Sequence, residues 1–380
     1  MTTDRLVESR VSAPIPRDRL SERAKWAILA GITIAFVALM FACAEGALRV
    51  RQAMKYGSAL SVDDLYRVDE RIGLRVPIAN LDTGRISTNS LGFRGPEIAL
   101  PKLPGTVRIA FLGASTTWCG EVSSNEHTWP HLVTQDLRAR FPGLAVDYVN
   151  AGVPGYVVNA SFTNLVHRVA PLEPDIIVIY HATNDMSREL RGLAAAKGLW
   201  IDGALDPGWV TKHSLLANLA DKNLRIWLAQ ARAERHAGRL EVDATLLGDA
   251  FRRDLESLVV EARRHAKMVL VATFATQLRQ EQAPDRQLQA SASALYYMPF
   301  MTPEGLLASY RRYNDIIREV ARDQGAVLVD GEDRISADPE HFADSVHFTD
   351  RGSRAMADRV SRVLSLQPWL NLAARRGSGA

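Results

Sequence analysis

Five short apolar runs alternate with stretches of helical spacing, and this alternation constrains the fold of the 380-residue chain more than any other feature. Several runs are rich in β-branched residues and all are too short for independent helices; they are residues 107–112, 146–149, 175–180, 268–273 and 326–329. Strands that alternate with helices form βαβ units, in which successive strands pair in parallel. The pattern therefore predicts an α/β protein with a parallel sheet.

Helical spacing is clearest at residues 127–140 and 349–366, where the second segment begins with Thr349 as a possible N-cap. Two irregular stretches, residues 186–247 and 276–302, interrupt the strand–helix rhythm. We interpret both as insertions over a functional site. The first contains an amphipathic helix with Trp227, which we expect to form a lid that packs on the core.

An uncharged apolar run near the N-terminus extends from Trp26 to Ala44 and is 19 residues long. A helix of this length can cross the hydrocarbon core of a membrane. A single transmembrane anchor is the leading interpretation. A cleaved signal peptide is an alternative, although no clear A-x-A site follows the run, and a lipoprotein signal ending at Cys43 is another. The sequence leaves open whether the segment is retained or cleaved.

Flanking cations predict the orientation of this segment. Six precede it, namely Arg5, Arg10, Arg17, Arg19, Arg23 and Lys25, and three follow it, namely Arg49, Arg51 and Lys55. The bias favours a cytoplasmic N-terminus. We therefore expect a single-pass protein of the inner (cytoplasmic) membrane, with the larger part of the chain in the periplasm or otherwise outside the cytoplasm.

The chain divides into five parts on these grounds. We expect a cytoplasmic polar tail over residues 1–24, a transmembrane helix over 25–48, and a linker with a small pre-domain over 49–104. The main domain then covers 105–370, and a disordered tail covers 371–380.

Composition excludes some functions and partners. The formal net charge is only +3, with both signs interspersed, so we expect no nucleic-acid partner. The two cysteines, Cys43 in the apolar run and Cys119, are not expected to form a disulfide. No Cys/His cluster has the spacing of zinc ligands. The oligomeric state is left open.

Candidate site residues follow four of the five predicted strands. Ser115 follows the first, Gly155 the second, Asn184 the third, and Asp344 and His347 lie downstream of the fifth. Reactive groups of open parallel sheets collect beyond the carboxyl ends of the strands. We therefore expect these residues to meet at one edge of the sheet.

Together these residues supply the parts for acyl transfer. A serine hydroxyl needs an adjacent base, for which His347 is the candidate, and Asp344 can hold the imidazole in the correct tautomer. The backbone N–H groups of Ser115 and Gly155 and the Asn184 amide can stabilise an oxyanion. This chemistry requires no metal or organic cofactor.

These segments, in this order, resemble the sequence blocks of the SGNH (GDSL-like) hydrolase superfamily. The resemblance covers about residues 105–366. It implies a flavodoxin-like three-layer α/β/α sandwich with about five parallel strands. It also implies that Ser115, Gly155, Asn184 and His347 are the invariant residues of the superfamily, with Asp344 as the third member of the triad.

One position departs from the pattern of the superfamily. Its common Gly-Asp-Ser is Gly113-Ala114-Ser115 here. This style, with Leu91-Gly92-Phe93-Arg94-Gly95 upstream, more resembles membrane-anchored bacterial members associated with surface polysaccharide. Deacylases and O-acyltransferases both occur in that group.

Three functions follow as hypotheses. The first is hydrolysis of an ester, either a carboxylic ester or an O-acyl group on a glycan, through an acyl-serine intermediate. The second is O-acyl transfer to a cell-surface polysaccharide by the same residues. The third is a non-catalytic glycan-binding component of the envelope. The acyl group, the alcohol and the pathway are not specified by the sequence.

Several residues near these motifs have structural interpretations. His181 is expected to be a locally hydrogen-bonded histidine, Asp185 to support the Asn184 loop, and Gly152 to shape its loop rather than join the oxyanion site. Cys119 is expected to be a small buried apolar residue. Arg94 could bind an anion or form a structural contact, and the sequence does not decide between the two.

Overall fold

The computed structural model describes residues 21–56, 65–201, 208–235 and 239–370. The expected polar tail over residues 1–24 lies mostly outside these ranges, and the expected C-terminal tail lies wholly outside them. The chain forms two compact units, one up to Leu48 and one from Arg49 onward, and each is described by itself.

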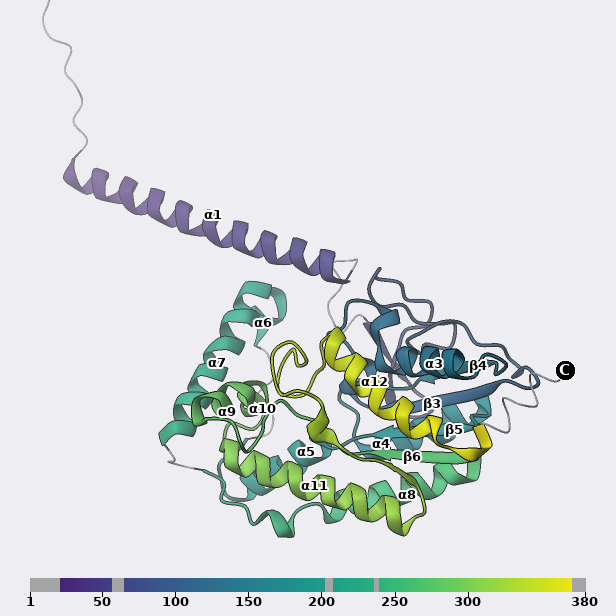
Figure 1. Ribbon diagram of the computed structural model, residues 1–380. Helices are drawn as coiled ribbons and strands as arrows, with labels where there is room; N and C mark the ends of the chain where they lie inside the picture. Colours follow the sequence, from purple (N-terminus) through teal and green to yellow (C-terminus); the bar gives the residue numbers. More distant parts are fainter. Residues whose placement is uncertain (1–20, 57–64, 202–207, 236–238, 371–380) are drawn as a thin grey trace, which may run out of the picture. The chain divides into compact units, whose positions relative to one another are not determined.

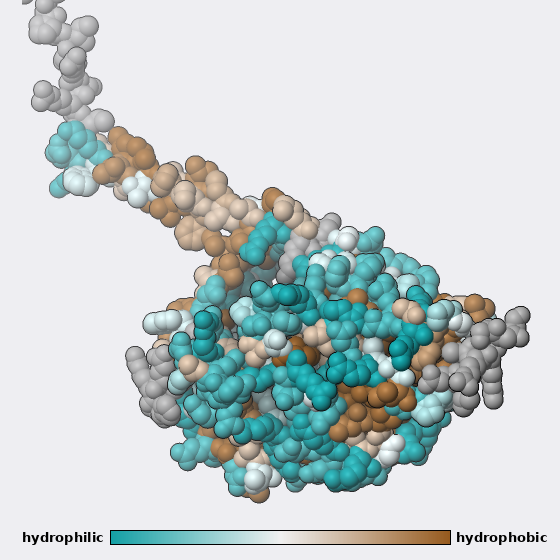
Figure 2. Space-filling model, in the orientation of Figure 1, coloured by the Kyte–Doolittle hydropathy of each residue, from teal (hydrophilic) through white to brown (hydrophobic). Residues whose placement is uncertain are grey.

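The first unit contains helix α1, Glu22–Tyr56, which continues past Leu48. Its residues Glu22–Met54 are long and apolar enough to cross a membrane, and none of the apolar window is buried. Figure 2 shows the hydrophobic side chains along this helix in brown. The structure thus contains a candidate membrane span, which a signal sequence would equally resemble.

The second unit is built on a five-stranded parallel sheet with the order β4-β3-β5-β6-β7 (Figure 1). The bounds of its strands are β3 Val107–Gly113, β4 Val146–Asn150, β5 Ile176–Tyr180, β6 Met268–Ala272 and β7 Val327–Val329. Every residue of β3, β5 and β6 is buried, because helices cover both faces of a parallel sheet. Each predicted run forms a strand, with ends displaced by one residue at most.

Helices form the two outer layers, as Figure 1 shows. On one face α3, Trp129–Arg140, contacts α12, Asp350–Ser365. On the other face α8, Asp249–His265, contacts both α4, Val158–Asn164, and α11, Pro303–Asp323. The predicted three-layer α/β/α class is confirmed.

Shorter elements complete the second unit. An antiparallel hairpin precedes the sheet, and α2 is the short helix after β3. Helix α5 begins just before the first insertion and continues into it, and α6, α7, α9 and α10 lie within the two insertions. The bounds are β1 Tyr66–Asp69, β2 Leu74–Pro77, α2 Ser115–Trp118, α5 Thr183–Ala196, α6 Trp209–His213, α7 Leu215–Arg235, α9 Pro284–Ala290 and α10 Ala292–Tyr297.

The insertion helix α7 contacts α6 and α10. That the helix forms a lid over the core stays a prediction; Trp227 itself is 63% exposed. An amphipathic pattern identifies an apolar face but not the surface that covers it.

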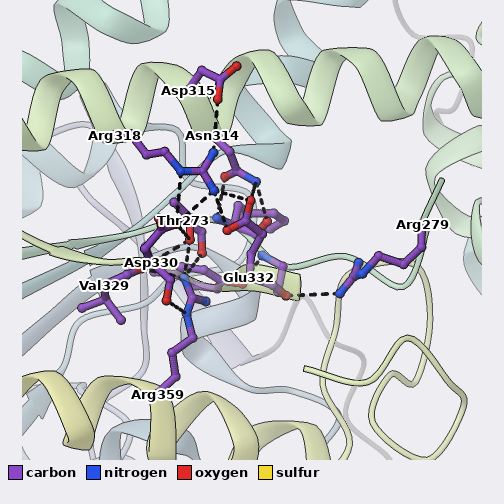
Figure 3. Close-up of polar contacts among 12 residues, drawn as sticks. Thr273, Arg279, Asn314, Asp315, Arg318, Val329, Asp330, Glu332 and Arg359 are labelled. Carbon is purple, nitrogen blue, oxygen red and sulfur yellow. Dashed lines mark hydrogen bonds and ion pairs between the residues drawn. The ribbon is translucent and has the colours of Figure 1, made fainter. Parts of the chain in front are cut away.

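Polar contacts attach α11 and α12 to the carboxyl ends of β6 and β7 (Figure 3), and those of α12 are the more buried. The Arg359 guanidinium on α12 donates to the carbonyl oxygens of Thr273 at 2.8 Å, Val329 at 2.6 Å and Asp330 at 3.1 Å. From α11, Arg318 pairs with Asp330 and with Glu332. Burial lowers the pKa of Arg359, but a guanidinium stays charged at neutral pH. These contacts fix α12, and hence the chain just before it, relative to the sheet.

Arg359→Ala is expected to lower the free energy of unfolding by about 3 kcal/mol, because buried carbonyl oxygens lose their donor. The exposed Arg362 on the same helix is the matched control, and Arg362→Ala should change stability by no more than about 0.5 kcal/mol. Denaturant unfolding of both variants measures the difference. If both variants lowered the free energy of unfolding equally, the Arg359 contacts would not be what stabilises this part of the fold.

Candidate active site

A cavity of about 560 Å³ lies where the chain leaves the carboxyl ends of the strands. All five residues predicted for the site, Ser115, Gly155, Asn184, Asp344 and His347, line it. The other lining residues are Arg75, Pro154, Val157, Thr183, Ser187, Arg188, Arg191, Lys222, Ser293, Ala294, Tyr297, Met298, Tyr310, Ser345 and Val346.

The turn that presents Ser115 depends on two glycines. Strand β3 ends at Gly113, and Ser115 opens helix α2 two residues later. A Cβ atom on Gly113 would lie 2.0 Å from Thr117 Oγ1, and one on Gly152 would lie 2.6 Å from Trp118 N. Neither distance is tolerable, so α2 can pack this closely only against glycine. Gly152 does not line the cavity, in keeping with a loop-shaping position.

The structure decides the interpretation of Arg94. Only 1% of the residue is exposed, and its guanidinium donates to Trp118 O at 2.8 Å, Cys119 O at 2.6 Å and Asn125 Oδ1 at 2.8 Å. Burial lowers the pKa of Arg94 to about 10, so it remains a cation at neutral pH. Arg94 therefore holds the end of α2 and forms a structural contact.

Ala114 belongs to a small apolar cluster next to the turn that carries Ser115. It is 4% exposed and packs with Leu65, Tyr66, Val153 and Tyr156. A carboxylate at this position would be buried among apolar side chains without water, which is unfavourable. The cluster thus gives a physical reason for alanine where the superfamily commonly has aspartate.

A continuous chain of hydrogen bonds connects Ser115, His347 and Asp344. His347 Nε2 lies 2.8 Å from Ser115 Oγ, and His347 Nδ1 lies 2.8 Å from Asp344 Oδ2. The other carboxylate oxygen of Asp344 accepts the backbone N–H groups of Val346 and His347, both at 2.9 Å. Asp344 is therefore fixed in its own turn, and it fixes the imidazole.

Asp344 and His347 each stabilise the charged form of the other. Burial raises the pKa of Asp344, but the hydrogen bonds and charge of His347 and the two backbone N–H groups outweigh burial and hold the pKa at about 2. Burial lowers the pKa of His347, but the hydrogen bond and charge of Asp344 raise it above its ordinary value. The carboxylate is ionised at neutral pH, and it stabilises an imidazolium.

A second Asp-x-x-His sequence stands six residues earlier, and the sequence analysis did not consider it. Asp338 Oδ1 lies 2.8 Å from His341 Nδ1, the same internal geometry as in the later pair. Neither residue lines the cavity. Both Asp-x-x-His sequences therefore form a carboxylate–imidazole contact. Only the tertiary structure determines that the second pair, and not the first, contacts Ser115.

Gly155 lies in the loop after β4 and Asn184 in the first turn of α5, and both line the cavity. Gly155 has φ +86°, a conformation that favours glycine. The Asn184 amide donates to Tyr156 O at 2.9 Å, and Asp185 Oδ1 accepts the N–H of Val158 at 3.1 Å. Both bonds connect the start of α5 to the loop after β4, so Asp185 supports the Asn184 loop.

His181 and Cys119 are buried and do not line the cavity. His181 is 3% exposed, and its Nε2 lies 2.8 Å from Ser161 Oγ, so it is a locally hydrogen-bonded histidine. Burial lowers the pKa of His181 to about 3, which keeps the ring neutral. Cys119 is buried, and burial raises the pKa of its thiol to about 11. The thiol is therefore not a nucleophile at neutral pH.

Sequence reasoning missed four cations on the cavity wall, Arg75, Arg188, Arg191 and Lys222. A signal existed for two of them. Arg188 and Arg191 stand four and seven residues after Asn184, which is the spacing of one helix face. The others come from β2 and α7, whose approach to the sheet no local pattern indicates.

Comparison with known proteins gives the class and the family. Residues 111–355, more than half of the chain, match the model of the GDSL-like Lipase/Acylhydrolase family. The protein is accordingly an ester-cleaving hydrolase. The chain belongs to the GDSL-like lipase/acylhydrolase family.

Solved structures with a similar chain path have low sequence identity. Axe2, an acetylxylan esterase from Geobacillus stearothermophilus, matches at 16% identity with a TM-score of 0.43, covering 69% of this chain and 95% of its own. The lipase/acylhydrolase from Enterococcus faecalis matches at 18% identity with a TM-score of 0.41, covering 68% and 95% respectively. A search of curated proteins finds no significant match.

The pKa of His347 is expected to fall when Asp344 becomes Asn, because the variant removes the carboxylate that stabilises the imidazolium. A histidine-resolved NMR titration measures it. Asp338→Asn is the matched control, since Asp338 contacts His341 and not His347. The geometry would be contradicted if the pKa of His347 stayed the same in Asp344→Asn but fell in Asp338→Asn.

Proposed function

We propose that the protein hydrolyses its ester through an acyl-serine intermediate, with Ser115 as nucleophile, His347 as base and Asp344 as the residue that orients it. The observation that carries the proposal is the pair of 2.8 Å contacts from Ser115 Oγ to His347 and from His347 to Asp344. Nucleophile, base and orienting group have this mutual geometry in serine hydrolases.

The steps follow from this geometry. Ser115 Oγ attacks the ester carbonyl carbon while His347 Nε2 takes the hydroxyl proton. The tetrahedral intermediate then collapses, and the imidazolium returns the proton to the departing alkoxide. Water, deprotonated by His347, then attacks the acyl carbonyl; when this second tetrahedral intermediate collapses, the imidazolium returns the proton to Ser115 Oγ and the acid is released. Asp344 stays ionised throughout and stabilises the imidazolium in both halves.

The developing oxyanion is assigned to the backbone N–H groups of Ser115 and Gly155 and to the Asn184 side chain. A primary amide has two N–H donors, and Asn184 uses one of them on Tyr156 O. That bond orients the amide, and the second N–H is the one we assign to the oxyanion. Preorganised donors of this kind need no reorientation when charge develops.

The substrate is a carboxylic ester or an O-acyl group on a glycan. The cavity is lined by hydroxyl-bearing and charged side chains as well as by Tyr297, 47% of which is exposed. Hydroxyl and charged groups suit a polar alcohol, and an exposed aromatic ring suits an amphipathic one. These features favour an acylated sugar over an aliphatic ester.

Ser115→Ala is expected to abolish ester turnover with the fold retained, and Asn184→Ala to lower kcat by roughly 10²–10³-fold. His347→Ala should match Ser115→Ala, because no other base contacts the hydroxyl among the described residues. His341→Ala is its matched control and should retain wild-type turnover. Release of 4-nitrophenol from 4-nitrophenyl acetate measures all four, and an active Ser115→Ala enzyme would falsify the mechanism.

We further propose that α1 anchors the protein in the inner membrane, with the hydrolase unit on the periplasmic side. The support is the uncharged run from Trp26 to Ala44 and the excess of cations before it. A full-length fusion with C-terminal alkaline phosphatase should show phosphatase activity, because that enzyme is active in the periplasm. The same fusion with green fluorescent protein should not fluoresce. The reverse result would place the unit in the cytoplasm.

A further inference from the structure

We propose that helices α6 and α7 of the first insertion bind the surface of a lipid bilayer that contains anionic phospholipids, through an exposed apolar face close to the end of the membrane span. The inference builds on the proposed membrane anchor, which brings α6 to the bilayer, and goes beyond it. An anchor alone does not define which surface of the hydrolase unit contacts the lipid.

Large apolar side chains of α6 and α7 form this face. Six of them are exposed among the described residues, namely Trp209, Val210, Leu219, Leu224, Trp227 and Leu228. On α7, Leu224, Trp227 and Leu228 have the i, i+3, i+4 spacing of a single helix face. The two helices contact each other and lie at the edge of the second unit, apart from the sheet (Figure 1). Exposed apolar patches of this kind mark surfaces that bind a membrane or another molecule. We call it the α6–α7 face.

Chain connectivity places α6 close to the end of the membrane span. Arg49 belongs to the second unit, and its guanidinium donates to the backbone oxygen of His213, the last residue of α6, at 2.9 Å. Arg49 also follows Ala44, the last residue of the uncharged run, by five positions in the same helix. At about 1.5 Å rise per residue, these two residues are about 8 Å apart along α1. A membrane-spanning α1 therefore brings α6 to the bilayer.

The tryptophans of the α6–α7 face favour a bilayer over a protein partner. Tryptophan concentrates at membrane–water interfaces, where its ring lies among the headgroups and its N–H group finds a polar partner. Trp209 is 74% exposed and Trp227 is 63% exposed. The other four tryptophans of the second unit, all within the described ranges, are buried or half-buried. The two exposed tryptophans of this unit thus both lie on the face that we assign to the lipid.

The charge of the segment is complementary to anionic phospholipids. Residues 208–235 contain five lysines or arginines and two acidic residues, so the segment keeps a net positive charge even though Arg225 pairs with Asp221. Lys212 is exposed on α6, and Arg49 and Arg51 are exposed at the end of α1. Basic residues beside an apolar face strengthen the binding of a helix to anionic headgroups.

Helix α7 connects the α6–α7 face to the catalytic cavity. Lys222 lines the cavity, and its ammonium lies 5.9 Å from the ring centroid of Tyr296 on α10. Trp227 follows Lys222 by five residues, which is about 140° around a helix, so the two side chains leave α7 on different sides. A bilayer bound to the α6–α7 face would therefore hold the cavity close to the membrane surface.

The test measures lipid contact in the full-length protein, reconstituted in vesicles of phosphatidylethanolamine and phosphatidylglycerol. Cys43→Ala removes the exposed cysteine, and Cys119 is buried. Trp227→Cys then carries a nitrobenzoxadiazole label, and quenching by phospholipids with a nitroxide in the upper acyl chain is recorded. We expect blue-shifted emission and strong quenching, because the α6–α7 face enters the headgroup region.

Asn218→Cys gives the matched control label. Asn218 is exposed on the same helix, and nine residues separate it from Trp227, which places it about 180° away around α7. The label at position 218 should keep the emission of a label in water and show little quenching. Equal quenching at positions 218 and 227, or no quenching at 227, would overturn the proposal.

A second variant tests whether the apolar side chains make the contact. With the label on Leu219→Cys, the change Leu224→Ser/Trp227→Ser should lower quenching to the level of the Asn218 label, whereas Val260→Ser on α8, an apolar residue that is 40% exposed, should not. Thermal unfolding and 4-nitrophenyl acetate turnover should stay unchanged, since none of these residues is among those that line the cavity. Quenching that persists in the double variant would contradict the α6–α7 face.

Flotation with the vesicles separates this proposal from the membrane anchor. Protein that floats and resists alkaline carbonate, but is not quenched at position 227, would overturn lipid binding by the α6–α7 face and leave the anchor standing. Flotation that carbonate abolishes, with quenching at 227 before that treatment, would contradict the anchor and support the face. Absence of flotation would overturn both. A blue shift that appears only at high protein density, without lipid quenching, would assign the face to a second copy of the chain and overturn lipid binding.

Discussion

The hydrogen bond between Ser115 Oγ and His347 Nε2 joins residues that are 232 positions apart in the sequence, and much of the fold serves to keep them in contact. Ser115 is placed by the end of β3, and His347 by the segment between β7 and α12. In a parallel sheet both ends face the same edge. The contact therefore depends on the sheet order and on the attachment of α12 to the ends of β6 and β7.

Two sets of buried contacts hold the partners of this bond. On the serine side, glycine at 113 and 152 lets α2 pack closely, and Arg94 binds the carbonyl oxygens at its end. On the histidine side, Arg359 attaches α12 to the ends of β6 and β7. Burying the charged guanidinium groups of Arg94 and Arg359 is tolerated because their contacts with carbonyl oxygens are charge-assisted hydrogen bonds.

The sequence predicted the sheet and the layers well because each strand is a short buried run and each helix carries periodic apolar residues. It also selected five of the residues that line the cavity, since reactive groups follow the strands. It could not place Trp227, which is exposed, because amphipathicity does not identify a partner. Nor could it distinguish Asp338–His341 from Asp344–His347, or gather Arg75 and Lys222 at the cavity, because those outcomes depend on tertiary structure.

The central claim is that the fold activates one serine. Fluorophosphonates phosphonylate a serine hydroxyl, with loss of fluoride, only when a base and an oxyanion site activate it. Peptide mapping of the full-length protein after such labelling should place the adduct on Ser115 alone, with labelling lost in His347→Ala and retained in His341→Ala. An adduct on another serine, or equal labelling of the His347→Ala protein, would contradict the account.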